Sequence, residues 1–423
     1  MNPKQTFPLA KLFEQVDNLR EEAIELQRQL TRIPALSPES GGDGEKAKAD
    51  FLYDWVQQSL RPDDMQWYHA PDNRVSCGYR PNLVARFNGR SARHTICIMA
   101  HVDVVPPGDL SKWSGDPWTM RVEQRAEGGA TLIGRGVEDN QQGLVSAVCA
   151  MKALRDLQVT PEFDVALLFV ADEETGSRYG AHFLVDHHAE LFSKKDLMII
   201  PDAGNQNGTM IEVAEKSILW LRFQTAGRQC HGSEPEKGRN AHKAANYLAY
   251  RLESLYQKFK KRNAMFQPPF STFEPTKREA NVPNINTIPG EDVMYFDCRI
   301  LPEYKTTDIL KAVRAIAKET ERKFRVKIAI TPQQGEQAAP PTSMDAPVVK
   351  AIAHAVRELR GRRPKPMGIG GGTVAACFRR AGIPAAVWST MEDTAHSPDE
   401  SCLVKNMLDD AKVFAHIFLQ KNL

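Results

Sequence analysis

The stretch Phe163–Gly176, FDVALLFVADEETG, contains a short apolar run that ends in three consecutive carboxylates. The run Val165–Val170 is rich in β-branched and aromatic residues, which is typical of a buried strand. Asp172, Glu173 and Glu174 follow it and repel one another at the end of that strand. This arrangement predicts that a cation lies beside them, and the rest of the chain indicates that the cation is a metal ion.

The overall composition is that of an ordinary globular protein. The chain has 423 residues, of which 42% are apolar and 26% are charged, with a net charge of +2. This length predicts roughly two to three domains, and the balanced charge does not indicate nucleic-acid or membrane-surface binding. Seven cysteines without a Cys-x-x-Cys pair favour free thiols in a reducing, cytoplasmic compartment. The start MNPKQTFPLAKLFEQ lacks the apolar segment of a signal peptide, and no run reaches the about 18 apolar residues of a membrane span.

Strands alternate with helices in most of the chain, which predicts an α/β domain with a doubly wound, mostly parallel sheet. The strands expected from apolar runs are Leu83–Phe87, Thr95–Ala100, Thr131–Gly136, Phe163–Val170, Leu197–Ile200 and Ala385–Trp388.

The pattern changes after about Val213, where two helices and four strands follow the order β-α-β-β-α-β of a ferredoxin-like unit. The central strands, Asn284–Ile288 and Val293–Cys298, flank Pro289-Gly290 and are predicted to form a hairpin. We therefore predict an inserted α+β lid domain at 213–333 and a discontinuous catalytic domain at 1–212 and 334–423.

Polar residues follow the predicted strands at their carboxyl ends, where ligands bind in doubly wound sheets. Five segments bring candidate metal ligands to this edge: His101, Asp139, Glu174, Asp202 and His396. Each alone has an ordinary explanation, such as a helix N-cap for Asp139 or a turn residue for Asp202. Two imidazoles and several carboxylates together suit Zn²⁺, and their number is enough for two ions.

Seven segments resemble those of the two-zinc hydrolases of metallopeptidase family 20. This family includes acetylornithine deacetylase, succinyl-diaminopimelate desuccinylase, glutamate carboxypeptidase, aminoacylase and several dipeptidases. The matching segments are MAHVDVVPPG, GRGVEDNQQG, ADEETGSRYG, PDAG, CHGSEPEKGRNA, NTIPG and AHSPDE. The resemblance covers nearly the whole chain, and it implies that the inserted domain is the family's dimerisation lid.

The resemblance also implies a role for each metal-site residue. His101 and Asp202 would hold one ion, Glu174 and His396 would hold the other, and Asp139 would bridge them. Asp103 would hydrogen-bond His101 and fix its tautomer. Glu173 would be the general base, while Asp172 has no assigned role. The ions are expected to be zinc, with cobalt or manganese as alternatives.

The lid residues of the family also have counterparts. His231 resembles a histidine that reaches the partner subunit's active site and stabilises the oxyanion, although without the resemblance the sequence favours a turn histidine before Gly232-Ser233. Asn286 and Arg299 resemble substrate-binding residues, and Arg299 would clamp a carboxylate unless it is a surface residue at a strand end. Gly371, Gly372 and Thr373 resemble a turn whose N–H groups bind the substrate carboxylate.

We therefore predict a metal-dependent hydrolase of the amide bond in an N-acyl amino acid, similar to acetylornithine deacetylase or succinyl-diaminopimelate desuccinylase. The substrate would be a small molecule with a linear amide, and the enzyme would be a homodimer. A dipeptidase or carboxypeptidase with the same chemistry is the main alternative, and a catalytically silent binding protein on this fold is the other. Val374-Ala375-Ala376 replaces the Ser-Asp that often follows Gly-Gly-Thr in the desuccinylases, which weakens the assignment of that particular substrate.

Overall fold

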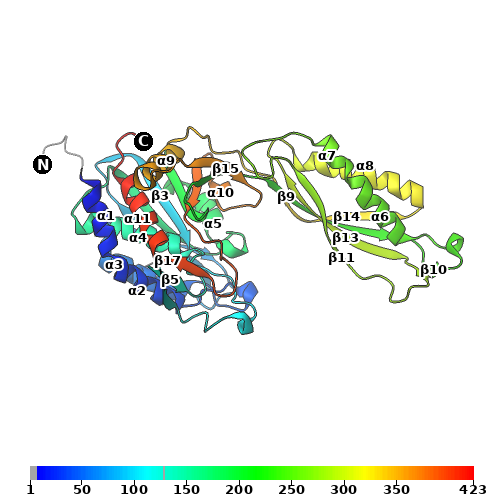
Figure 1. The fold of residues 1–423 in the computed structure, drawn as a ribbon, viewed down its shortest axis with the longest axis horizontal. Coiled ribbons are helices and arrows are strands. Elements are labelled where there is room, and N and C mark those ends of the chain that lie inside the picture. Colours follow the sequence, from blue (N-terminus) through cyan, green and yellow to red (C-terminus); the bar gives the residue numbers. More distant parts are fainter. Residues whose placement is uncertain (1–6, 127–128) are drawn as a thin grey trace. The chain divides into compact units, whose positions relative to one another are not determined.

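The computed structural model describes residues 7–126 and 129–423 and divides them into two compact units, each described by itself (Figure 1). The first unit comprises the described residues up to Val213, Thr342–Pro366 and Cys377–Leu423. The second comprises Ala214–Pro341 and Met367–Ala376. Residues 1–6, with which the predicted catalytic domain begins, lie outside the described residues.

The unit boundaries lie close to the predicted domain boundaries except in two segments. Residues 334–341 and Met367–Ala376, which we assigned to the catalytic domain, belong to the second unit. Hydrogen bonds explain the second segment: the N–H of Lys216 donates to the carbonyl of Ile369 at 3.0 Å, and Thr373 Oγ1 donates to Glu215 Oε1 at 2.6 Å.

An eight-stranded sheet forms the framework of the first unit, in the order β1-β2-β6-β3-β7-β16-β8-β15, although the ends of β8 (from Ala214) and β15 (from Met367) belong to the second unit. The strands are β1 (Asp64–Pro71), β2 (Tyr79–Phe87), β6 (Phe163–Val170), β3 (Ser91–His101), β7 (Leu197–Gly204), β16 (Ala385–Ser389), β8 (Met210–Glu215) and β15 (Lys365–Ile369). The neighbours β6, β3, β7 and β16 are parallel, whereas β1, β2 and β8 pair antiparallel. The α/β class with a parallel centre is thus confirmed.

Helices of the first unit bury their apolar faces in its core. They are α1 (Leu9–Asn18), α2 (Arg20–Thr31), α3 (Lys46–Ser59), α4 (Gln141–Asp156), α5 (Ala181–His187), α9 (Pro347–Arg360), α10 (Ala375–Arg380) and α11 (Val404–Phe418). The central helix α4 is buried over most of its length and packs against α11 (Figure 1). Because its first turn is part of this core, the loop before it is held firmly in place.

One predicted strand belongs to a different sheet. The segment expected at Thr131–Gly136 forms β5 (Ala130–Ile133), which pairs with β4 (Arg121–Gln124) and β17 (Ser401–Leu403) in a separate three-stranded sheet. Asp139 therefore does not follow a strand of the main sheet, but lies in the turn that precedes α4.

The second unit has a four-stranded antiparallel sheet of order β11-β13-β9-β14. Its elements are β9 (Ser217–Ala226), β10 (Cys230–His231), α6 (Ala241–Leu252), α7 (Ser254–Lys258), β11 (Thr272–Arg278), β12 (Thr287–Ile288), β13 (Glu291–Ile300), α8 (Thr306–Phe324) and β14 (Lys327–Glu336). The predicted β-α-β-β-α-β order is present, and α6 and α8 pack on this sheet over a core that includes Phe223, Leu248 and Phe296.

The predicted hairpin across Pro289-Gly290 is wrong. The short strand β12 pairs with β10, with His231 opposite Thr287, and β13 instead pairs with β11 and β9. The edge strand β11 was missed because five of its seven residues are exposed and polar or proline, so that it lacks an apolar pattern. Among the described residues, no helix has the length and apolarity needed to span a bilayer.

The buried histidine of α11 makes the stability of the first unit sensitive to pH. Burial, reinforced by His354 on α9, lowers the pKa of His416 from its usual 6.5 to about 4. Below pH 6.5 His416 is protonated in the unfolded chain, whereas in the folded chain it stays neutral until the pH falls to about 4. Stability is therefore lost as pH falls through this window, by at most about 3 kcal/mol.

We expect the His416→Leu variant to keep the stability that the wild type loses between pH 6.5 and about pH 4. Urea unfolding of chelator-treated protein at pH 7 and pH 4 should show a smaller loss in the variant than in the wild type. His187→Gln, at an exposed position on α5 of the same unit, is the matched control and should keep the wild-type loss. Equal losses in wild type and His416→Leu would contradict the assignment.

Candidate active site

Side chains from five segments of the first unit meet beyond the carboxyl ends of its parallel strands. His101 ends β3, Asp202 lies near the end of β7, and His396 follows β16 in a loop. Asp139 precedes α4, and Glu173 and Glu174 lie in a 3₁₀ turn after β6. All the predicted metal-site residues are therefore in one place, even though Asp139 arrives by an unexpected route.

Asp139 lies between the two imidazoles. His101 Nε2 is 2.9 Å from Asp139 Oδ1 and 3.4 Å from Asp202 Oδ1. His396 Nε2 is 3.0 Å from Asp139 Oδ2 and 3.1 Å from Glu174 Oε2. The two carboxylate oxygens of Asp139 thus face two different imidazoles, Oδ1 that of His101 and Oδ2 that of His396. A ligand that bridges two metal ions requires this arrangement.

Two ligand sets share His101. One nitrogen or oxygen from each of His101, Asp139 and Glu174 lies within 4.8 Å of the others, and the same is true of His101, Glu173 and Asp202. Distance alone therefore does not distinguish Glu173 from the ligands.

Asp103 positions the turn of Glu173 and Glu174. Its Oδ1 accepts the N–H of Glu173 at 3.1 Å, and its Oδ2 accepts the N–H of Glu174 at 3.0 Å. His101 Nδ1 lies 3.0 Å from the backbone carbonyl of Asp103 and 3.4 Å from its carboxylate. The carbonyl is therefore the nearer group that keeps a proton on Nδ1 and turns Nε2 towards the carboxylates.

Asp172, to which the sequence assigned no role, fixes the same turn from the other side. Its backbone is left-handed with φ 67°, and its carboxylate accepts the Thr175 hydroxyl and, at 3.0 Å, the N–H of Tyr179. Buried Arg80 lies 3.5 Å from Asp172 and also binds Glu45. The Asp-x-x-Thr spacing was a usable signal for a local cap, whereas the sequence carries no signal for the Arg80 contacts.

The electrostatics of the cluster indicate a shortage of positive charge. Burial, reinforced by Asp202, raises the pKa of Glu173 well above its usual value, and burial also raises the pKa of Glu174. Hydrogen bonds to Asp139 and Glu174 raise the pKa of His396 to about 10. Burial lowers the pKa of His101, but Asp202 and hydrogen bonds to the carboxylates outweigh it, so that the pKa lies well above 6.5.

The donor set fits divalent cations. Imidazole nitrogens and carboxylate oxygens are the ligands that zinc and similar ions prefer. Glu174 Oε1 is buried without a hydrogen-bond partner among the described residues, and a cation would satisfy it. Divalent ions would also offset the repulsion that raises the carboxylate pKa values.

The predicted lid residues all belong to the second unit, where they form two groups. His231 and Asn286 are neighbours through β10 and β12, because the N–H of Gly232 donates to the Asn286 carbonyl at 2.6 Å. Arg299 on β13 donates from Nη1 to the carbonyl of Gly370 at 3.0 Å, beside the turn Gly371–Thr373.

Arg299 is already engaged by a carboxylate. Its Nε and Nη2 donate to the two oxygens of Asp297 at 2.7 and 2.9 Å, and the indole N–H of Trp220 also donates to Asp297 at 3.2 Å. This ion pair offsets the positive charge that a substrate carboxylate would use.

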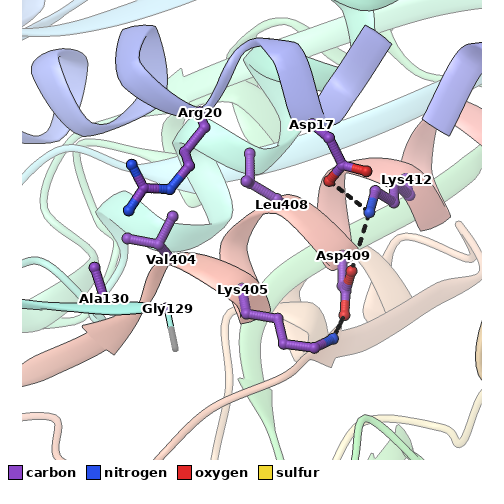
Figure 2. Close-up of a pocket in the computed structure, with 9 residues that line it drawn as sticks. All are labelled: Asp17, Arg20, Gly129, Ala130, Val404, Lys405, Leu408, Asp409 and Lys412. Carbon is purple, nitrogen blue, oxygen red and sulfur yellow. Dashed lines mark hydrogen bonds and ion pairs between the residues drawn. The ribbon is translucent and has the colours of Figure 1, made fainter. Parts of the chain in front are cut away.

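A surface pocket of about 400 Å³ in the first unit has a different character (Figure 2). Lys412 lies 2.7 Å from Asp17 and 3.4 Å from Asp409, and Lys405 also pairs with Asp409 (Figure 2). Because these lysines are paired within the pocket, its charges are explained by the packing of α1 against α11.

Histidines and carboxylates gathered beyond the parallel strands of an α/β sheet are typical of a metallohydrolase. The chain belongs to the Peptidase family M20/M25/M40, which matches residues 97–420, and it hydrolyses amide bonds. The resemblance drawn from the sequence motifs is thereby confirmed.

Relatives and solved structures agree with this placement. An uncharacterized metallohydrolase of Methanocaldococcus jannaschii is 37% identical, covering 95% of this chain and 99% of its own. A succinyl-diaminopimelate desuccinylase of Phenylobacterium zucineum is 27% identical, covering 94% and 97%. The fold is similar to that of human carnosine dipeptidase 1, with a TM-score of 0.71 at 16% identity, covering 98% and 99%.

Proposed function

We propose that this protein removes the acyl group from an N-acyl amino acid by hydrolysing its amide bond beside a carboxylate. The observation that carries the proposal is the placement of Asp139 between His101 and His396, with Glu173 held next to them by Asp103. The similarity to a desuccinylase over 94% of the chain supports an acyl amino acid as the substrate class.

Two divalent ions, zinc in our proposal with cobalt or manganese as alternatives, would be held by these side chains. His101 and Asp202 would bind one ion, Glu174 and His396 would bind the other, and Asp139 would bind both. When bound, such ions lower the pKa of water and polarise the scissile carbonyl.

Glu173 is proposed as the general base. Its backbone N–H is anchored on Asp103, so its carboxylate is held beside His101 and Asp202. Burial raises the pKa of Glu173, which suits a group that takes a proton from the attacking water and returns it to the leaving nitrogen.

The second unit would act as a lid that supplies substrate contacts and forms a homodimer. His231 would donate to the oxyanion from the partner's side, and Asn286 would bind substrate beside it. The turn Gly371–Thr373 would bind the substrate carboxylate together with Arg299. Because Asp297 pairs with Arg299, we propose that the turn N–H groups carry most of this recognition.

A dipeptidase or carboxypeptidase is the second candidate. The segment Val374-Ala375-Ala376 after the turn lacks the Ser-Asp that often follows it in desuccinylases, and α10 begins there at Ala375. A silent binding protein is disfavoured, because the proposed base and all five proposed ligands are present. The seven free cysteines support a reducing compartment such as the cytoplasm.

Turnover of a substrate panel tests the proposal. Zinc-loaded protein is expected to hydrolyse N-acetylornithine or N-succinyl-diaminopimelate at least about tenfold faster, by kcat/KM, than any member of a dipeptide panel. Release of the free amine, followed by ninhydrin or coupled assay, measures each rate. Faster cleavage of dipeptides would replace the proposal by the second candidate.

A further inference from the structure

The two loops that bring Asp139 and His396 together are connected by a pair of glutamates that neither the metal cluster nor the proposed mechanism uses. Glu138 precedes Asp139, and Glu400 follows His396 in the second loop. Both side chains are almost completely buried, at 1% and 0% exposure. Each glutamate binds the backbone of the opposite loop.

Glu138 holds the loop of His396. Its carboxylate accepts the N–H of Glu392 at 2.5 Å, the N–H of Thr394 at 2.6 Å and the Thr394 hydroxyl at 2.7 Å. The Thr394 oxygen in turn accepts the N–H of Ser401 at 2.9 Å. The backbone two residues before His396 is therefore tied to the residue next to Asp139.

Glu400 holds the loop of Asp139. Its carboxylate accepts the N–H groups of Gly136 at 3.0 Å, Glu138 at 2.9 Å and Asp139 at 2.9 Å. Arg135 Nη1 donates to the same carboxylate at 2.5 Å. Four N–H donors thus converge on one buried carboxylate, and these contacts fix the backbone of Asp139.

His396 needs such support more than His101 does. The His101 side chain is 2% exposed at the end of a central strand, whereas the His396 side chain is 56% exposed on a loop. His396 also has a left-handed backbone with φ 63°, which a non-glycine residue keeps only when its surroundings enforce it. Core packing fixes His101, while the hydrogen bonds between the loops fix His396.

We propose that Glu138 and Glu400 are positioning residues that form a reciprocal clamp between the two loops. The clamp holds His396 Nε2 at 3.0 Å from Asp139 Oδ2. Glu138 thereby controls the affinity of the metal position formed by Glu174, His396 and Asp139 and leaves the position of His101 and Asp202 largely independent. Glu400, which fixes the bridging Asp139, acts on both positions. The inference rests on the proposed assignment of these residues as ligands.

Zinc titration of the full-length protein against a chromophoric chelator tests the clamp. For Glu400→Gln we expect both zinc affinities to fall, because Glu400 anchors the bridging Asp139. For Glu138→Gln we expect one of the two zinc affinities to fall by about 10–100-fold, the usual effect of losing a partner outside the ligand shell. The other affinity is expected to stay within about twofold of wild type. Thr394→Val, which removes only one hydroxyl, is expected to lower the same affinity by a smaller factor and guards against misfolding of the glutamine variants.

Asp196→Asn is the matched control. Asp196 is also buried in the first unit and accepts two N–H groups, from Thr95 at 2.9 Å and Ser193 at 2.7 Å, but it lies before β7 at the opposite end of the strands. The variant Asp196→Asn should lower the thermal midpoint of the metal-free protein without changing either zinc affinity.

Two results would overturn the clamp: equal loss of both affinities in Glu138→Gln, or unchanged affinities with lowered stability, as in the control. Failure of the proposed function is recognised separately, because it appears in the substrate panel as faster cleavage of dipeptides. Failure of the ligand assignment appears as wild-type protein that binds fewer than two zinc ions.

Discussion

Replacing Glu173 with glutamine is expected to lower kcat for every substrate by about 10²–10⁴-fold, the contribution of a positioned general base. The amide keeps the size of the side chain but cannot take a proton from water. The N–H that Glu173 donates to Asp103 belongs to the backbone, so the turn remains in place. Steady-state kinetics with the best panel substrate, together with the zinc content of the variant, measure the effect.

The zinc content separates the two possible roles of Glu173. If Glu173 is the base, Glu173→Gln binds two ions with nearly wild-type affinity, whereas loss of one ion would make Glu173 a ligand. Glu190→Gln, at an exposed position of the same unit, is the control and should leave kcat unchanged. A Glu173→Gln enzyme with the wild-type rate would end the proposed mechanism.

Removing metal with a chelator is expected to lower hydrolysis to the detection limit and to destabilise the first unit. The carboxylates of Asp139, Glu174 and Asp202 then face one another, with His101 and His396 as counter-charges. At a free ion concentration 100 times Kd, each ion stabilises the folded state by about 2.7 kcal/mol. Thermal unfolding with and without zinc, cobalt or manganese measures the change, and activity should return when the ion is restored.

The affinity of the cluster for metal ions is expected to depend on pH. Burial raises the pKa of Glu174 and of Asp202, so both carboxylates take up protons more readily than usual as pH falls. Protons then compete with the metal, and the affinity should decrease with falling pH. Full activity in chelator-treated protein that is free of metal by elemental analysis would contradict the metal assignment.

The candidate site could be predicted largely because strand ends are local features of the sequence. The run Val165–Val170 is buried as expected, and the carboxylates after it reach the cluster. The prediction was less successful where pairing between distant segments decided the outcome. Asp139 reaches the site from the turn before α4, since β5 pairs with β17 instead of joining the main sheet.

Polar segments were the least predictable part of the fold. The edge strand β11 is mostly exposed, so no apolar pattern distinguishes it from a loop, and the neighbouring Pro289-Gly290 suggested a hairpin that does not form. The contacts of Arg299 with Asp297 and Gly370 were likewise invisible, because a chain alone does not show which surface carboxylate an arginine meets.

The stretch Phe163–Gly176 illustrates what the sequence by itself determined. The sequence identified this buried strand, the metal-binding chemistry of the residues beyond it and, from seven such segments, the family. Residue types and their order within short segments suffice for these conclusions. Only the tertiary structure decided that Asp103 holds the turn of Glu173 and Glu174. It also decided that Glu138 and Glu400, 262 positions apart, fasten the loops of Asp139 and His396. The physical reason is that such contacts join backbone N–H groups to carboxylates across the fold, and every residue type supplies a backbone N–H except proline.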